Sequence, residues 1–144
     1  MAGSSIEGSP IEGIRRTLAQ YCQLCDDGRF AEWIDCFTAD ARFHVMGRKH
    51  IGHDAIRGFM EVGQSPERRG RHLIGEPVID VSPDGATALA WTDYLFIDKP
   101  SRAITSVGRY HDQLVLGDDG RWRFAVREIV FQEGEPAATQ PPPG

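Results

Sequence analysis

Apolar residues recur every three or four positions near the start of the chain, a spacing that predicts an amphipathic helix over residues 11–27. Its apolar side chains form one stripe along the helix: Ile11, Ile14, Leu18, Cys22 and Cys25. Ser9 and Pro10 are typical of a helix start, because proline needs no amide partner in the first turn. Tyr21 lies at one border of the stripe and Asp26 near the other. A carboxylate at the edge of a buried stripe needs a partner, so Asp26 indicates a polar pocket inside the core.

Two more helices and one strand are predicted before the middle of the chain. Residues 29–37 place four apolar side chains on one face of a short helix: Phe30, Trp33, Ile34 and Phe37. Residues 41–46 alternate between apolar and polar and predict a strand that ends at Gly47. A third helix is predicted near residues 54–62, which carry three apolar residues at helical spacing.

The second half of the chain changes to long strands separated by turns rich in glycine, aspartate and proline. The predicted strands cover residues 71–81, 86–98, 104–116 and 121–131, with a bulge or a sheet edge at Pro77. Helices followed by an antiparallel meander predict an α+β fold in which the helices cover one face of the sheet. Because the later strands are apolar on both faces, we expect a second subunit to cover the other face.

The composition is that of one ordinary globular domain: 144 residues, of which 40% are hydrophobic and 26% charged. The net charge of -5 and the absence of a lysine and arginine stripe argue against nucleic acid as the main partner. We expect no membrane span, since no run of about 18 apolar residues occurs, and the start of the chain lacks a signal-peptide pattern. The chain is therefore expected to be cytoplasmic. Disorder is expected over residues 1–9 and over the proline-rich residues 133–144.

Two groups of residues resemble metal or redox ligands, but their positions and spacing favour an ordinary structural role. Cys22 and Cys25 match C-x-x-C, but they lie near the end of the predicted helix, whereas a redox pair needs a helix N-terminus. His44, His50 and His53 have no acidic or cysteine partner at a recognisable zinc spacing. Three cysteines in a chain of this length do not suggest a disulfide framework. The sequence therefore predicts no metal site and no cofactor.

Three titratable or charged side chains on the predicted strands are candidates for chemistry. Asp93 has large apolar neighbours on its strand face, so it is paired, protonated or placed at an exit to solvent. His72 opens the first long strand and is either a surface residue or, beside a buried carboxylate, a proton shuttle. Arg127 either extends past the sheet edge into water or places its guanidinium on a carboxylate or a developing oxyanion. The residues alone leave these alternatives open.

The order of these features resembles the nuclear transport factor 2-like superfamily and, within it, the SnoaL-like and scytalone dehydratase-like branch. The resemblance covers residues 10–132 and is carried by the helix with Tyr21 and Asp26, by FAEWIDCFTADARF, by His72 and by GRYHDQLVLGDDGRWRF. It implies a cone-shaped α+β fold, in which a strongly curved antiparallel or mixed sheet wraps around three N-terminal helices and a pocket. It also implies a homodimer or homotrimer formed through the sheet.

In catalytic members of this branch, an aspartate near the end of the first helix pairs with a histidine at the start of a long strand. The resemblance therefore implies that Asp26 and His72 form such a pair here. The final-strand arginine of hexachlorocyclohexane dehydrochlorinase corresponds to Arg127, and a tyrosine of bile acid dehydratases corresponds to Tyr21, a hydrogen-bond donor. Asp93 corresponds to a further acid beside the histidine. The dehydrochlorinase has lysine where Tyr21 stands, so halide elimination is not specifically supported.

The resemblance implies a cofactor-independent dehydratase-type lyase or an isomerase, with a small, mostly apolar cyclic substrate such as a steroid, terpenoid or polyketide. His72 would remove a proton while Asp26 fixes the tautomer of its ring. Tyr21 and Arg127 would stabilise the developing oxyanion. Aromatic side chains are expected to bind the substrate and exclude water: Trp33, Phe37, Phe43 and Trp91. Two alternatives stay open, a non-catalytic module that binds a hydrophobic ligand in the same fold and a polyketide cyclase.

Overall fold

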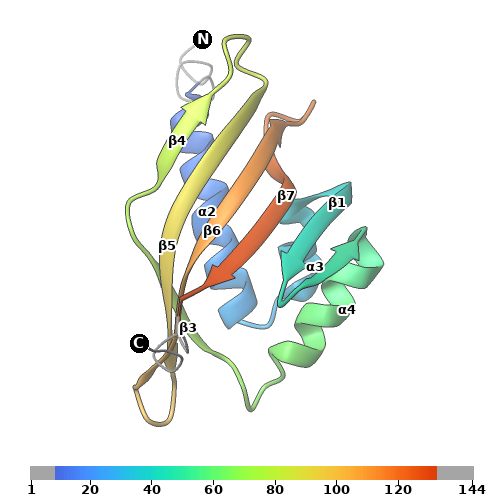
Figure 1. Cartoon of the computed structure of the whole chain (residues 1–144). Helices are drawn as coiled ribbons and strands as arrows, with labels where there is room; N and C mark the ends of the chain where they lie inside the picture. The colour runs from blue at the N-terminus through green and yellow to red at the C-terminus, as the bar shows by residue number, and fades with distance from the viewer. Residues whose placement is uncertain (1–8, 133–144) are drawn as a thin grey trace.

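The computed structural model describes residues 9–132, which form a curved, mixed sheet with helices on one face (Figure 1). The helical elements are α2 (Pro10–Asp26), α3 (Phe30–Trp33), the 3-10 turn η1 (Ile34–Cys36) and α4 (His53–Gly63). The strands are β1 (Phe37–Val45), β2 (Arg48–Ile51), β3 (Gly70–Ile74), β4 (Val78–Val81), β5 (Thr87–Asp98), β6 (Ile104–Leu116) and β7 (Trp122–Phe131). This is the predicted α+β class.

The strand order in the sheet is β2-β1-β7-β6-β5-β3, and β4 also pairs with β5. All strand pairs are antiparallel except β1 and β7, which are parallel and make the sheet mixed. The disordered ends expected over residues 1–9 and 133–144 lie outside the described residues, apart from Ser9. None of the helices within the described range is long and apolar enough to cross a membrane.

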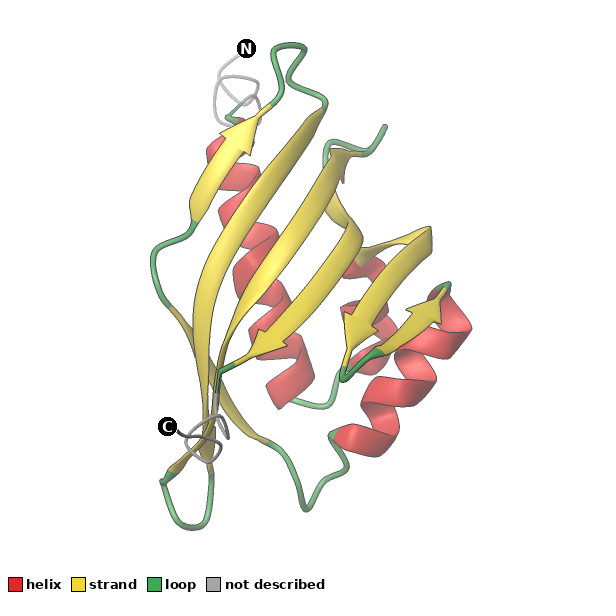
Figure 2. Ribbon diagram, in the orientation of Figure 1, coloured by secondary structure: helices red, strands yellow, loops and turns green. Residues whose placement is uncertain are grey.

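Helix α2 lies along the inner face of the long strands, behind the sheet in the view of Figure 2. It starts as predicted, because the Ser9 side chain accepts a hydrogen bond from the Glu12 amide at 3.3 Å and Pro10 opens the first turn. Farther along, the Thr17 hydroxyl donates to the Trp122 carbonyl oxygen at 2.7 Å, a buried bond between α2 and β7. This bond fixes the helix on the sheet, and with it the position of Asp26 at the other end of the helix.

Two predicted elements differ from the observed ones. The strand predicted over residues 71–81 is two strands, β3 and β4, because residues 75–77 interrupt the ladder and Pro77 has no amide hydrogen to donate. The helix predicted over residues 29–37 ends at Cys36 in a 3-10 turn. Phe37 is extended (φ -114°, ψ 147°) and opens β1, four residues before the predicted start of that strand.

Gly70 opens β3 and lets this strand approach β5 closely. A Cβ at Gly70 would lie 2.2 Å from the Ile97 carbonyl oxygen and 2.8 Å from the Phe96 ring. We expect Gly70→Ala to lower the free energy of unfolding by about 1–3 kcal/mol, the usual cost of overpacking. In urea denaturation the matched control is Gly58→Ala in α4, where a Cβ meets nothing within 4 Å and alanine favours the helix. Equal stability of the two variants would contradict the close approach of β3 and β5.

Candidate active site

The end of α2 and the start of β3 bring Asp26 and His72 together. The His72 ring nitrogen Nδ1 lies 2.6 Å from Asp26 Oδ1, and the backbone amide of His72 donates to Asp26 Oδ2 at 2.9 Å. Both carboxylate oxygens are thus held by one residue. The side chains are 4% exposed for Asp26 and 10% exposed for His72, so the pair is almost fully shielded from water. The geometry is that of a carboxylate which orients an imidazole.

The position of Asp26 explains why it needs two hydrogen bonds. As the last residue of α2 it lies at the negative end of the helix dipole, which disfavours a second negative charge. Arg71, the arginine of β3, pairs with Asp27 at 3.6 Å and not with Asp26. The Nδ1 proton of His72 is therefore directed at Asp26, and Nε2 is the ring nitrogen left to accept a proton.

A cavity of about 210 Å³ lies between the sheet and α4, and His72 is part of its wall. Tyr94 and Phe96 of β5 flank the His72 ring, with ring centroids 6.5 and 4.7 Å away. The rest of the wall is mainly apolar or aromatic and includes Phe59 and Met60 of α4. His72, which Asp26 holds in place, thus borders a small, mainly apolar cavity.

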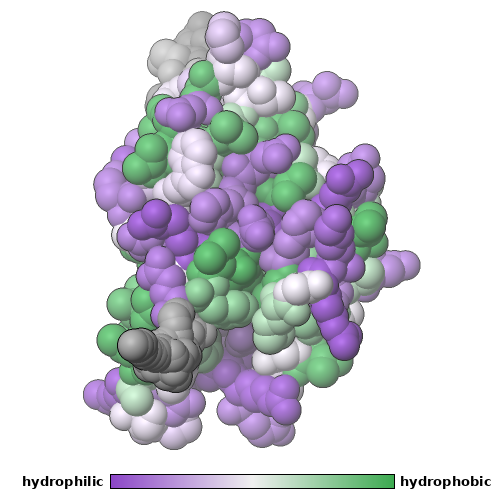
Figure 3. Space-filling model, in the orientation of Figure 1, coloured by the Kyte–Doolittle hydropathy of each residue, from purple (hydrophilic) through white to green (hydrophobic). Residues whose placement is uncertain are grey.

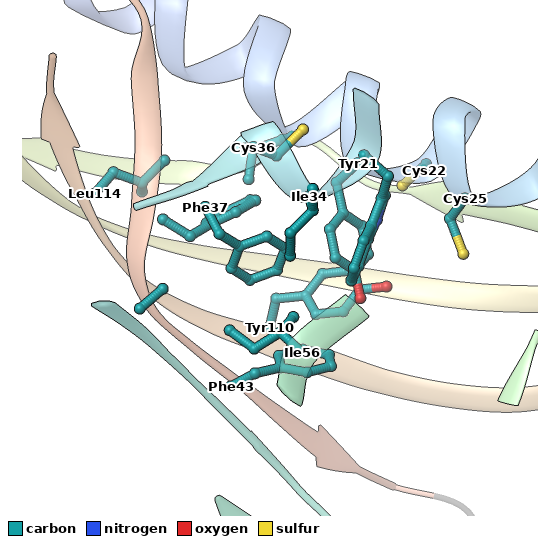
Figure 4. Packing of buried hydrophobic residues seen from close by; sticks show 14 of the residues in the cluster. Tyr21, Cys22, Cys25, Ile34, Cys36, Phe37, Phe43, Ile56, Tyr110 and Leu114 are labelled. Carbon is teal, nitrogen blue, oxygen red and sulfur yellow. The ribbon is translucent and has the colours of Figure 1, made fainter. Parts of the chain in front are cut away.

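Two tyrosines reach the same cavity from opposite layers of the fold. Tyr21 comes from α2 and Tyr110 from β6, and their ring centroids are 5.6 Å apart. In Figure 4 both hydroxyl oxygens end on the side of the cluster that faces away from Leu114. Burial raises the pKa of both phenols well above the usual value, although the nearby positive charge of Arg127 opposes the rise. Both hydroxyls are therefore hydrogen-bond donors at neutral pH.

Arg127 lies beneath these tyrosines and does not line the cavity. Its Nε and Nη2 atoms donate to the two carboxylate oxygens of Asp112 at 2.8 and 2.9 Å. The guanidinium also stacks on three rings, at 4.2 Å from the centroid of Tyr21, 3.6 Å from Tyr110 and 4.1 Å from Phe124. Burial alone would lower the pKa of Arg127, but Asp112 outweighs this and holds the pKa above its usual value.

The direct contact between Arg127 and substrate that the resemblance implied is therefore wrong for this cavity. Two of the three guanidinium nitrogens are used by Asp112, and the third, Nη1, is buried without a partner. The side chains of Arg127 and Asp112 are only 1% and 0% exposed. This ion pair therefore contributes to the site by supporting the tyrosine rings that line the cavity.

Asp93 and Trp91 lie on the outer face of the sheet, so their predicted places at the site are wrong. Both belong to β5, where the inward-facing residues are Ala90, Thr92 and Tyr94. Asp93 is exposed and pairs with Arg109 at 2.5 Å, which lowers the pKa of the carboxyl group. Neither residue can reach His72, which faces inward on the other side of the sheet.

The other three aromatic residues expected to bind substrate are core residues. Trp33, Phe37 and Phe43 are fully buried and pack in a chain of rings, with centroids 5.0 Å apart for the first two and 5.7 Å for the last two. None of the three lines the cavity. They lie behind its wall, because Trp33 contacts Tyr21 and Phe43 contacts the cavity residue Phe59.

The residues that sequence reasoning missed are Tyr94, Tyr110 and Asp112. Every second residue in the middle of β6 is buried on the same face of the sheet: Tyr110, Asp112 and Leu114. This two-residue period was the available signal, since an aspartate in phase with buried apolar residues indicates a buried carboxylate.

The structure shows the surroundings of the cysteines and histidines that matched ligand patterns. Cys22 and Cys25 are buried free thiols in the core. His53 Nε2 lies 2.9 Å from the Phe37 carbonyl oxygen, and His50 stacks on Phe59 at 4.1 Å between ring centroids. Among residues 9–132, no group of potential metal ligands includes any of His44, His50 and His53.

The fold and site define a cone-like α+β protein with an aspartate–histidine pair beside an apolar cavity. The SnoaL-like domain family matches residues 9–128, most of the chain, so the chain belongs to the SnoaL-like family. Members of this family include polyketide cyclases and dehydratases. Among curated protein sequences, none matches the chain.

Several solved structures share the fold of this chain. The D26N form of Rv3472, a protein of unknown function from Mycobacterium tuberculosis, is 27% identical with a TM-score of 0.78, over 85% of this chain and 71% of that one. A scytalone dehydratase-like protein from Novosphingobium aromaticivorans is 23% identical with a TM-score of 0.75, over 92% and 89% of the two chains. A nuclear transport factor 2-like protein with a cystatin-like fold, from the same organism, is 22% identical with a TM-score of 0.75, over 88% and 84%.

Proposed function

We propose that this protein is a cofactor-independent dehydratase-type lyase or isomerase in which His72 is the general base. Nε2 of His72 removes a proton from a carbon next to a carbonyl group of the substrate. Asp26 accepts the hydrogen bond from Nδ1, which fixes the tautomer and stabilises the imidazolium that forms. The Tyr21 and Tyr110 hydroxyls donate to the oxyanion that develops on the carbonyl oxygen. In a dehydration, the imidazolium then returns its proton to the departing hydroxyl group.

The observation that carries this proposal is the 2.6 Å contact between Asp26 and His72, whose side chain lines an apolar cavity. A binding module for a hydrophobic ligand needs the cavity but has no use for a buried carboxylate held by two hydrogen bonds at a helix C-terminus, where burial is costly. The same groups would also serve a polyketide cyclase, which differs in the length of its substrate.

The cavity volume limits the substrate. Sites for drug-sized molecules measure roughly 300–1,000 Å³, whereas this cavity is about 210 Å³. A molecule of one ring or two fused rings fits this space better than a four-ring steroid. Aromatic walls formed by Tyr94 and Phe96 favour a flat ring over a branched aliphatic chain.

The test is a screen of one-ring and two-ring hydroxy-ketones and cyclic ketones, with thermal stabilisation as the first readout and turnover as the second. We expect several compounds to stabilise the protein against heat, and at least one of them to lose water or to be isomerised. Ligands that stabilise the protein without any turnover would favour the non-catalytic binding module.

We also propose that a second copy of the chain covers the outer face of the sheet. Figure 3 views the molecule from this side and shows apolar patches separated by polar side chains. Exposed apolar residues lie on several strands of this face: Leu73, Leu89, Val107 and Val130. The half-buried Trp91, which is absent from the site, belongs to the same face.

Replacing Leu89 and Val107 by aspartate is expected to convert a dimer or trimer to a monomer, because charge in an apolar interface is costly. Sedimentation analysis of the wild type and this double variant measures the change. Val62→Asp is the control, since Val62 is exposed on α4, away from the sheet face. A wild-type protein that sediments as a monomer at high concentration would contradict the proposal.

A further inference from the structure

Three potential metal ligands meet at the end of α2, and the proposed mechanism uses only two of them. The thiol of Cys25, a carboxylate oxygen of Asp26 and a ring nitrogen of His72 all lie within 4.8 Å of one another. Cys25 is fully buried and has no part in the proposed proton transfer. Burial raises the pKa of its thiol, so that the sulfur stays protonated at neutral pH unless a cation displaces the proton.

We infer that these three residues form a site for a borderline-soft divalent cation such as Zn²⁺, and that the cation is an inhibitor rather than a cofactor. The ligands are one sulfur, one nitrogen and one oxygen. Zn²⁺ accepts all three, whereas Mg²⁺ and Ca²⁺ prefer oxygen alone. Three protein ligands leave the fourth tetrahedral position to water. A thiolate and a carboxylate together cancel the charge of a divalent ion, which favours its burial.

The Asp26 and His72 side chains need little movement to bind an ion, and the Cys25 sulfur, within 4.8 Å of both ligand atoms, must approach them by up to about 1.3 Å. Zinc bonds of about 2.0–2.3 Å place tetrahedral ligand atoms about 3.3–3.6 Å apart. The contact between Asp26 Oδ1 and His72 Nδ1 is 2.6 Å, so the two side chains must separate by about 1 Å or less. The bond from the His72 amide to Asp26 Oδ2 can hold the carboxylate in place while Oδ1 binds the ion.

The ion does not need to pass through the substrate cavity. A second hollow of about 510 Å³ lies between α2 and β3 and is lined by both Asp26 and His72. The half-exposed carboxylate of Asp27 also lines this hollow, where the guanidinium of Arg71 partly balances its charge at 3.6 Å. His72 thus borders both the substrate cavity and the hollow by which the ion arrives.

Binding would block the base by switching its tautomer. When the ion takes Nδ1, the proton of the neutral ring moves to Nε2, which then has no lone pair to accept a proton from substrate. The Cys25 thiol proton is released to solvent, one proton for each ion bound. This inhibitory consequence rests on the proposed function, whereas binding of the ion does not.

Titration of the full chain with Co²⁺ tests the site without any substrate, because cobalt replaces zinc and reports its ligands by its colour. We expect one equivalent to give a thiolate-to-cobalt charge-transfer band together with the intense visible bands of a tetrahedral ion. Zn²⁺ should abolish both sets of bands. With Cys25→Ser the charge-transfer band should disappear, and Cys25→Ser and His72→Gln should each weaken binding at least tenfold. Cys36→Ser is the matched control, since Cys36 is equally buried but outside the group, and it should keep the full spectrum.

The absence of a charge-transfer band in the wild type, or a band that persists in Cys25→Ser, would overturn the inference. If Cys25→Ser does not fold, His72→Gln decides the matter, because its side chain borders both hollows and an amide fills a similar space. A correct spectrum combined with no turnover of any ketone would leave the metal site in place and refute only the proposed function.

Discussion

Replacing His72 by glutamine is expected to lower turnover of any substrate of the cavity by about 10²- to 10⁴-fold, the usual contribution of general acid–base catalysis. The amide of glutamine can still donate a hydrogen bond to Asp26, so the buried carboxylate keeps a partner. It cannot accept a proton from carbon, because an amide nitrogen is not basic. His72→Ala should lose turnover similarly, but it leaves the Asp26 carboxylate with only the backbone amide as donor. The measurement is kcat of each variant at saturating ketone.

The thermal stabilisation that the ligand gives to wild type should largely survive in His72→Gln, since the apolar wall of the cavity is unchanged. His111→Ala is the matched control because His111 lies on the outer face of the sheet, opposite Trp91 in the neighbouring strand. Its turnover should equal that of wild type. Wild-type turnover in His72→Gln would refute His72 as the base, and loss of both turnover and ligand binding would assign His72 to binding alone.

Removing one partner of the buried ion pair is expected to have the largest effect on stability. Asp112→Ala leaves the guanidinium of Arg127 buried beneath three aromatic rings with no counter-charge. The cost of such an orphaned charge is about 3–5 kcal/mol of the free energy of unfolding. Urea denaturation of the wild type and the variant measures it.

The double variant Arg127→Met with Asp112→Leu removes both charges but keeps a similar side-chain volume. It therefore separates the effect of the charges on stability from the effect of packing. Replacing a buried ion pair by apolar residues of similar volume is often neutral or stabilising. We therefore expect the double variant to recover most of the stability that Asp112→Ala loses. A loss of less than about 1 kcal/mol in Asp112→Ala would mean that water reaches the pair, contrary to its 1% and 0% exposed side chains.

The sequence predicted the elements that depend on local signals. Ser9 and Pro10 begin α2 where the sequence places its start, and turns rich in glycine and aspartate precede β5 and separate β6 from β7 close to the predicted bounds. These signals act through backbone torsions and hydrogen bonds of a few neighbouring residues, so they can be read without the fold.

The pairing of Asp26 with His72 came from the family resemblance together with one physical cue, the carboxylate at the edge of an apolar stripe. The structure brings these residues into contact although they are 46 positions apart in the chain. The misplacement of Asp93 has a physical reason. Strand β5 is apolar on both faces, so alternation shows which residues share a face but not which face is covered by helices.

The same limit applies to Arg127. From the sequence, both a carboxylate and an oxyanion are possible partners of the guanidinium. The register of β6 against β7 decides between them by placing Asp112 opposite Arg127. Such a pairing is set by long-range strand contacts, which one sequence without its fold does not reveal.

The role of His72 as the base depends on the tautomer of its ring, and ¹⁵N NMR of the histidine side chains measures this tautomer. We expect the ring to carry a proton on Nδ1, directed at Asp26, and the resonance of Nε2 to move when a cyclic ketone enters the cavity. In Asp26→Asn this preference should weaken or reverse. A wild-type ring with its proton on Nε2 and a resonance that no cavity ligand shifts would contradict the assignment of His72 as the base.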